Sequence, residues 1–277
     1  MGLPDRSRRL IVNADDFGRS TSINHAVIRA HREGILTSAN LMVNEPWCEE
    51  AVDLARENPS LGVGLHLSLV CGKSALAFDK IPGLITTENE FSDNAVVSGL
   101  RFFFLPHLKA QIRDELDAQF ARFRSTGLPL DHVNGHLNIH LHPIVFRILM
   151  ENAKPWGIRH LRLTSDPLAL NLKLAQGNLP YRLSHAVIYK FLSTWARPKL
   201  AREKILHPEN VFGLLQNGRV EESFLASLLP HLPPGNSELY SHPSLDEFKS
   251  EFDALISPRV KAAVQELGIQ LIRYQDF

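Results

Sequence analysis

Two adjacent carboxylates, Asp15 and Asp16, are the first residues in the chain whose types and spacing could do chemistry. They lie in the stretch LIVNADDFGRSTSIN, directly after the short apolar run Leu10 to Val12. Neighbouring carboxylates repel each other, so burying both as anions is costly unless a cation or a shared proton offsets the repulsion. The pair therefore indicates a metal site, with one aspartate as a ligand and the other beside it as a base. The alternative is that one of them only caps the helix that follows.

A second group of candidate side chains is in the histidine-rich segment 131–143, DHVNGHLNIHLHP. The histidines of this segment are His132, His136, His140 and His142. Histidine serves both as a neutral metal ligand and as a proton donor near neutral pH. These four cannot share one strand face unless the segment stays extended, so we expect a strand that ends near Asn134 and an irregular loop after it. A lone histidine is more often a core residue, but this cluster, together with Asp15 and Asp16, favours a metal site.

Two further histidines stand at the ends of predicted strands. His66 lies in LGVGLHLSL, and His242 follows ELYS. Because functional residues of parallel α/β proteins gather at the carboxyl ends of strands, Asp16, His66 and one histidine of 136–142 should converge. Two histidines and one carboxylate leave open positions for water and substrate, as a hydrolytic metal requires. His242 would approach the same site and protonate a leaving group, unless it is a structural histidine before a proline.

The elements that must position these side chains alternate between strand and helix, an order typical of parallel sheets. Strands are predicted at residues 10–12, 36–43, 61–69, 130–133, 160–163, 238–241 and 269–274. Helices are predicted at residues 20–32, 47–57, 109–125 and 144–156, the first of them capped by Ser20, Thr21 or Ser22. Residues 70–106 lack a clean period, which predicts a long active-site loop after the third strand with short helical pieces. The length and the 44% hydrophobic composition favour one barrel-sized α/β domain over residues 1–277.

Residues 171–204 differ from the rest of the chain in composition. They contain seven lysines and arginines but one acidic residue, Glu203. Ile188, Phe191, Leu192 and Trp195 fall at helical spacing, which predicts a basic amphipathic helix inserted in the barrel. Such a helix either packs on the barrel with a solvated face or meets a membrane or a lipidic substrate.

Composition excludes several other classes of protein. Thirty basic residues balance thirty acidic ones, so no global positive field recruits nucleic acid. The two cysteines, Cys48 and Cys71, are too few for a disulfide framework and are expected to be reduced. The basic N-terminus is not followed by a signal-length apolar run, and no apolar stretch reaches about 18 residues, which predicts a cytoplasmic protein. Neither a Walker-type loop nor a dinucleotide-binding glycine motif is present in the sequence.

In combination, the motifs resemble the YdjC-like carbohydrate deacetylases, relatives of the chitooligosaccharide deacetylase. The resemblance covers nearly the whole chain and rests on LIVNADDFGRS with Asn24, LTSANLMVN, GLHLSL, DHVNGHLNIHLHP and ELYSHP. It implies an irregular (β/α) barrel of parallel strands. It also implies one divalent metal ion, zinc or magnesium, and hydrolysis of an N-acetyl group from an amino sugar.

Carried onto matching positions, the resemblance also implies roles for individual residues. Asp16, His66 and His136 would hold the metal. Asp15 would be the general base and His242 the general acid.

Three further residues are candidates for substrate contact. His140 would be a reserve ligand or a substrate contact, Arg162 would orient the substrate or the base, and Asn24 would bind the substrate. Family members often have a histidine where this chain has Asn138. That departure leaves the ligand triad intact and changes what surrounds it.

The segments RFFFLP (101–106) and TGLPLDHVN (126–134) look most like the hopanoid-biosynthesis-associated branch of the family, HpnK. This branch implies an N-acetylglucosaminyl hopanoid substrate, with 171–204 docking peripherally at the cytoplasmic face of the inner membrane. We also expect a homodimer. The alternatives are a chitooligosaccharide deacetylase, a metal-dependent phosphohydrolase and a non-catalytic carbohydrate-binding protein. Arginines and lysines near the site are sparse, which disfavours the phosphohydrolase.

Overall fold

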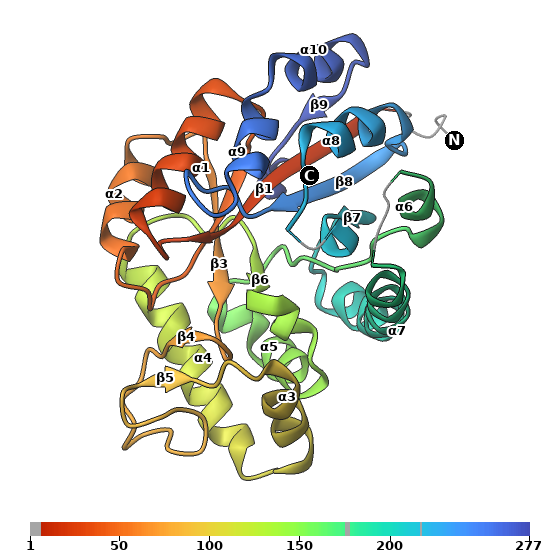
Figure 1. Ribbon diagram of the computed structural model, residues 1–277. Helices are drawn as coiled ribbons and strands as arrows, with labels where there is room; N and C mark the ends of the chain where they lie inside the picture. Colours follow the sequence, from red (N-terminus) through yellow and green to blue (C-terminus); the bar gives the residue numbers. More distant parts are fainter. Residues whose placement is uncertain (1–6, 175–177, 217) are drawn as a thin grey trace.

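A seven-stranded parallel sheet lies at the centre of the computed structural model, which describes residues 7–174, 178–216 and 218–277 (Figure 1). Its strand order is β6-β3-β2-β1-β8-β7, and β9 pairs with β1. The strands are β1 (Arg8–Phe17), β2 (Ser38–Leu41), β3 (Gly62–Leu67), β6 (Val133–Gly135), β7 (Asn210–Phe212), β8 (Gly235–Ser241) and β9 (Gln270–Leu271). Because the described pairings are parallel, the carboxyl ends of the strands meet at one edge.

The sheet curls, and residues 160–165 lie between its outer strands β6 and β7. The Arg162 amide donates to the carbonyl oxygen of Val133 at 3.0 Å, and the Val211 amide donates to that of Ser165 at 3.2 Å. Of the predicted strand 160–163, only His160 and Leu161 form isolated bridges. The predicted irregular (β/α) barrel of parallel strands is therefore confirmed, with one side closed by isolated bridges and a few backbone hydrogen bonds.

Helices surround the sheet (Figure 1). The α-helices are α1 (Thr21–Glu33), α2 (Cys48–Arg56), α3 (Ala95–Phe104), α4 (Leu108–Ser125), α5 (Pro143–Trp156), α6 (Leu168–Leu174), α7 (Leu179–Glu203), α8 (Glu222–Leu228), α9 (Lys249–Ile256) and α10 (Pro258–Glu266). Short 3-10 turns are η1 (His136–Leu141), η2 (Leu214–Gln216), η3 (Leu229–His231) and η4 (Tyr274–Asp276).

The core lies between the helices and the sheet. Leu10, Ile11 and Val12 of β1 are all fully buried, as expected for a parallel strand that is covered on both faces. On α4, Ile112 and Leu116 are buried one turn apart, which confirms the predicted apolar face of that helix.

The first strand extends further than its apolar run and carries both aspartates. Asp15 and Asp16 lie at the carboxyl end of β1, where Asp16 adopts a left-handed backbone conformation with φ of 65°. The cap of α1 is Ser20, whose Oγ accepts the Ile23 amide at 3.2 Å. The alternative that an aspartate serves only as this cap is therefore wrong.

Residues 70–106 are more ordered than the predicted loop. Strands β4 (Gly72–Lys73) and β5 (Glu90–Phe91) form a small antiparallel pair, and α3 follows with Asn94 as its cap. Several apolar side chains of α3 remain exposed, including Val96 (73%) and Phe104 (68%).

The described part of residues 171–204 forms the end of α6 and the 25-residue helix α7. The predicted amphipathic arrangement is only partly correct: Phe191 is 71% exposed, whereas the Trp195 ring packs on Phe146 at a centroid distance of 5.3 Å. In the described part of the chain, no helix combines the length and the apolar character needed to cross a membrane.

Two elements near the C-terminus differ from the prediction. The strand predicted at 269–274 is shorter, because β9 contains only Gln270 and Leu271 and Tyr274 begins η4. The three-residue strand β7 was not predicted at all. It pairs with β8 through Val211 and Phe212, so tertiary contact rather than a local pattern makes it a strand.

Candidate metal centre and active-site pocket

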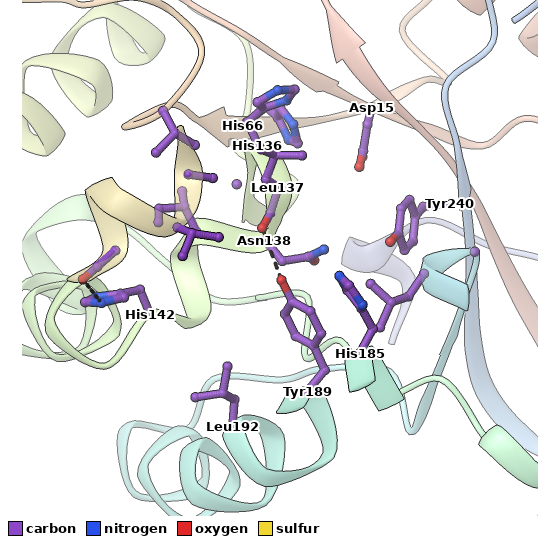
Figure 2. Close-up of a pocket in the computed structure, with 18 of the residues that line it drawn as sticks. Asp15, His66, His136, Leu137, Asn138, His142, His185, Tyr189, Leu192 and Tyr240 are labelled. Carbon is purple, nitrogen blue, oxygen red and sulfur yellow. Dashed lines mark hydrogen bonds between the residues drawn. The ribbon is translucent and has the colours of Figure 1, made fainter. Parts of the chain in front are cut away.

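Asp16, His66 and His136 converge from three strand ends. One ligand atom from each lies within 4.8 Å of the others, and all three residues are buried. His136 Nδ1 is 3.0 Å from Asp16 Oδ1, and His66 Nε2 is 3.4 Å from the same oxygen. Figure 2 shows the two histidine rings side by side, with Asp15 across from them. The structure thus brings together the three ligands expected from the sequence.

A hydrogen bond fixes the orientation of the His66 ring. His66 Nδ1 lies 2.7 Å from Asn134 Oδ1, which can only accept, so Nδ1 carries the proton. The lone pair of Nε2 therefore points toward Asp16. A hydrogen bond from the second ring nitrogen is the usual way in which a protein orients a metal-binding histidine. This arrangement fits a divalent metal held by two imidazoles and one carboxylate.

The ligand side chains also hold a strong internal ion pair. Burial alone would raise the pKa of Asp16, but the hydrogen bond and charge of His136, the largest opposing influences, hold it well below its usual range. Burial likewise opposes the charged form of His136, yet the Asp16 carboxylate raises the pKa of this histidine to about 10. A proton thus lies between these two side chains, where a divalent cation would replace it.

Asp15 is held beside the ligands by Arg162. Arg162 Nη1 donates to Asp15 Oδ2 at 2.8 Å and Nη2 donates to Oδ1 at 2.9 Å. Oδ1 also accepts from the side-chain amides of Asn40 and Asn134. Burial would raise the pKa of Asp15, but the Arg162 guanidinium, the largest opposing influence, holds it far below its usual range. Asp15 is therefore an anion, and Oδ2 is its less heavily bonded oxygen.

Arg162 binds a second buried carboxylate on its other side. Its Nη2 lies 2.7 Å from Glu238 Oε1, and Glu238 Oε2 accepts the hydroxyl of Tyr274. Arg162 is 1% exposed and does not line the cavity, so its donors face Asp15 and Glu238. The sequence analysis placed Glu238 in the ELYSHP motif but assigned it no role. The alternation of β8, which places residues 238, 240 and 242 on one side, is the signal that could have found it.

His242 lies between two carboxylates. Its Nε2 is 4.0 Å from Asp15 Oδ2 and its Nδ1 is 3.9 Å from Glu251 Oε2. Glu251 is fully buried on α9, and its other oxygen accepts the Val220 amide at 2.8 Å. Sequence reasoning missed Glu251, because nothing in its local pattern separates it from a surface glutamate of an amphipathic helix.

Two predicted substrate contacts lie away from the pocket. Asn24 is fully buried, and its Oδ1 accepts the Gly18 amide at 2.8 Å while its Nδ2 donates to Glu50. His140 is also fully buried, with Nε2 2.9 Å from the carbonyl oxygen of Arg162. The structure thus places both side chains outside the cavity lining: Asn24 holds the turn after Asp16, and His140 anchors η1.

A cavity of about 420 Å³ opens beside the ligands, a size within the roughly 300–1,000 Å³ of small-molecule sites. Asp15, His66 and His136 line one end, and Figure 2 shows His185, Tyr189 and Leu192 of α7 at the other. Among the described residues that line this cavity there is no lysine or arginine. The described lining therefore offers no cationic lysine or arginine side chain to an anionic ligand.

Comparison with known proteins gives relatives along the full length of the chain. Residues 9–266 match the YdjC-like protein family. A chitooligosaccharide deacetylase from Proteus mirabilis is 32% identical over 278 residues, covering 96% of this chain and 98% of the relative. A carbohydrate deacetylase from Geobacillus stearothermophilus is 30% identical over 272 residues, covering 98% of each.

A solved structure has the same fold. It comes from Enterococcus faecalis, was proposed to be a cellobiose-phosphate cleavage protein, and superposes with a TM-score of 0.74 at 22% identity over 98% of both chains. This chain belongs to the YdjC-like protein family.

Proposed function

We propose that this chain is a metal-dependent hydrolase that removes the N-acetyl group from an amino sugar. The observation that carries the proposal is the convergence of Asp16, His66 and His136 beside a buried anion, Asp15, in a pocket whose described lining has no lysine or arginine. The names of the full-length relatives, a carbohydrate deacetylase and a chitooligosaccharide deacetylase, support it.

Each of these residues has a separate role in the proposed reaction. A divalent metal ion held by Asp16, His66 and His136 would supply Lewis-acid activation of the amide and of water. Asp15 Oδ2 accepts the proton of the attacking water, because it is ionised and its remaining acceptor capacity faces His242. His242 then donates a proton to the nitrogen as the C–N bond breaks. The products are acetate and a free amine.

Phosphate-ester hydrolysis fits the pocket less well. A phosphate is usually held by arginine or lysine, and none lines the described cavity. Arg162 does not serve, because Asp15 and Glu238 occupy its donors.

We further propose that the amino sugar is attached to an apolar lipid, as in the hopanoid branch. Val96 of α3, which is 73% exposed, and Leu192 of α7 both line the cavity. On the same two helices, Phe104 of α3 and Val187 and Phe191 of α7 are each more than 60% exposed. Exposed apolar side chains are a feature of lipid and membrane contact sites, and the basic residues of α7 favour an anionic membrane surface.

Acetate release tests the catalytic proposal. Purified protein is assayed on N,N′-diacetylchitobiose and on an N-acetylglucosaminyl lipid, before and after chelation and with metal added back. Chelator-sensitive release from either substrate is expected, and from the lipid in particular if the aglycone is apolar. No release from either substrate, with metal confirmed to be bound, would contradict the deacetylase assignment.

Sedimentation with anionic liposomes tests the membrane proposal separately. The double variant Val187→Ser, Phe191→Ser should bind less well and still hydrolyse a soluble substrate. Trp195 is left unchanged, because its packing on Phe146 makes it a structural residue. Unchanged liposome binding would remove the membrane proposal and leave the hydrolase proposal standing.

A further inference from the structure

We propose that Tyr274 is a positioning residue for the proposed general base: its hydroxyl fixes the Glu238 carboxylate, and Glu238 in turn sets how closely Arg162 approaches Asp15. The inference rests on the proposed deacetylase function and deepens it, because it adds a residue on which the rate at that site depends. Tyr274 begins η4 and lies beyond residue 266, where the match to the YdjC-like protein family ends. It is fully buried and does not line the cavity, so it acts only through other residues.

The Arg162 guanidinium is shared between two carboxylates. Its Nη2 donates to Asp15 Oδ1 at 2.9 Å and to Glu238 Oε1 at 2.7 Å. Its Nε donates to the same Glu238 oxygen at 2.9 Å. The Tyr240 ring covers one face of the guanidinium, with 4.2 Å between Cζ and the ring centroid. The cation is therefore confined between the carboxylates, and the position of Glu238 sets the length of its bonds to Asp15.

Tyr274 bonds the oxygen of Glu238 that Arg162 leaves free. Glu238 is fully buried, and its Oε2 accepts the Tyr274 hydroxyl, while Asn13 Nδ2 donates to Oε1 at 2.9 Å. Burial, and after it the charge of Glu238, raises the pKa of Tyr274 well above its usual value, so the hydroxyl keeps its proton and donates. Without this hydroxyl, Oε2 would have no donor among the described residues, which is costly for a buried carboxylate.

The Tyr274 ring is itself held in place by residues at the start of β6. It stacks on the His132 ring, with centroids 3.9 Å apart and an interplanar angle of 9°. His132 Nδ1 lies 2.9 Å from Asp131 Oδ2, and Asp131 Oδ1 accepts the Gln275 amide at 3.1 Å. β3 leaves room for this stack, because a Cβ on Gly64 would lie 2.6 Å from His132 Cε1. The hydroxyl is thus presented to Glu238 in one fixed position.

Loss of the hydroxyl should therefore be felt at Asp15. A Glu238 carboxylate with an unpaired oxygen is stabilised by turning both oxygens toward Arg162, because the guanidinium is the nearest cation. That movement draws Nη2 away from Asp15 Oδ1 and changes the orientation of the base, to which catalytic rates are sensitive. Metal binding should not change, because Asp16, His66 and His136 are unaltered.

The test is Tyr274→Phe, which removes the hydroxyl and keeps the ring that stacks on His132. kcat and KM are measured on whichever of N,N′-diacetylchitobiose and the N-acetylglucosaminyl lipid releases acetate, and metal content is measured by mass spectrometry. The matched control is Ile112→Val, a conservative change at a fully buried position of α4 outside the cavity lining. Thermal unfolding compares the stability that each variant loses.

The kcat of Tyr274→Phe should fall about threefold to tenfold, the effect of losing about one hydrogen bond that orients the base. KM and metal content should stay at their wild-type values. Ile112→Val should keep the wild-type kcat although it also lowers stability. A wild-type kcat in Tyr274→Phe, a rise in KM alone, or an equal fall in both variants would overturn the positioning role and leave the deacetylase function intact.

A double-mutant cycle tests whether Tyr274 acts through Arg162. In an Arg162→Lys background the two-point contact with Asp15 is already lost, so adding Tyr274→Phe should reduce kcat little further. Losses that multiply would overturn the proposal, because they would show that Tyr274 acts independently of Arg162. A Glu238→Gln background gives the same comparison if Arg162→Lys does not fold.

If no substrate is hydrolysed, the proposed function fails, and the positioning role is then judged by the NMR resonance of the Arg162 Nε–H group. Its loss in Arg162→Lys assigns this resonance. Because Nε donates to Glu238, Tyr274→Phe should shift the resonance or speed its exchange with solvent, and Ile112→Val should do neither. A resonance unchanged by Tyr274→Phe would overturn the proposal.

Discussion

Arg162 contacts both carboxylate oxygens of Asp15, with Nη1 2.8 Å from Oδ2 and Nη2 2.9 Å from Oδ1. This two-point contact fixes the plane of the Asp15 carboxylate as well as its charge. The same guanidinium also donates to a second carboxylate, with Nη2 2.7 Å from Glu238 Oε1. The base is thus held by a cation that has no access to solvent.

Replacing Arg162 with lysine should keep a positive charge but lose the planar fork. We expect a loss of roughly tenfold to a hundredfold in kcat, because lysine cannot bond both Asp15 oxygens and Glu238 in one geometry. Stability should fall by about 1–3 kcal/mol in urea unfolding, as for the loss of a hydrogen bond to a charged group. A variant with wild-type kcat would show that the orientation of Asp15 does not limit the rate.

Asp15→Asn should separate catalysis from metal binding. The amide cannot accept the proton of water, so kcat should fall by about 10²–10⁴, the usual contribution of a general base. Metal content, measured by mass spectrometry, should be largely retained, because Asp16, His66 and His136 are unchanged. A purely carbohydrate-binding protein would tolerate this substitution in a binding assay and would show no activity to lose.

His136→Ala should remove the metal. The wild-type site holds a proton between His136 and Asp16, since the pKa of His136 is raised to about 10, and that proton must leave when a cation binds. Metal binding to the wild type should therefore release protons and weaken as pH falls. Calorimetry in buffers of different ionisation enthalpy measures the release. Undiminished metal binding by His136→Ala would contradict the assigned ligand set.

Glu251→Gln should change the behaviour of His242 without touching the pocket. The Glu251 carboxylate accepts the backbone amide of His242 and lies 3.9 Å from His242 Nδ1, whereas a glutamine side chain has only one accepting oxygen for the amides of His242 and Val220. The substitution should therefore displace His242 and reduce kcat about tenfold. Asp253→Asn is the matched control, because Asp253 lies exposed on the same helix and pairs with Lys249. An unchanged kcat would show that the position of His242 does not depend on Glu251.

Residue types at strand ends predicted the convergence of Asp16, His66 and one histidine of 136–142, and the resemblance to the YdjC-like family singled out His136. Asp16 and His66 follow apolar runs, and a parallel sheet brings such positions to one edge. Glu251 could not be predicted in this way, because its burial depends on how α9 packs against the loop that carries His242. His140 and Asn24 had suitable chemistry, but their partners, the Arg162 carbonyl and the Gly18 amide, are set by tertiary structure. Trp195 shows the same limit, since helical spacing alone does not say which face meets the barrel.

Asp166 offers a prediction about stability. It is buried beside η2, where its Oδ2 accepts the Leu215 amide at 3.2 Å, and burial raises its pKa from 3.8 to about 7. Between about pH 4 and pH 7 the unfolded chain ionises this carboxyl while the folded chain keeps it protonated. The folded state therefore binds more protons in that window, and Asp166 lowers stability as pH rises through it.

Asp166→Asn should remove this pH-dependent cost, because the amide has nearly the shape of the neutral carboxylic acid and does not ionise. The gain in unfolding free energy should be absent near pH 4 and reach at most about 4 kcal/mol above pH 7, at about 1.4 kcal/mol for each unit by which a pKa is raised. Urea unfolding of both proteins from pH 4 to pH 8 measures the difference. If the two curves stay parallel across this range, Asp166 ionises with its ordinary pKa in the folded protein.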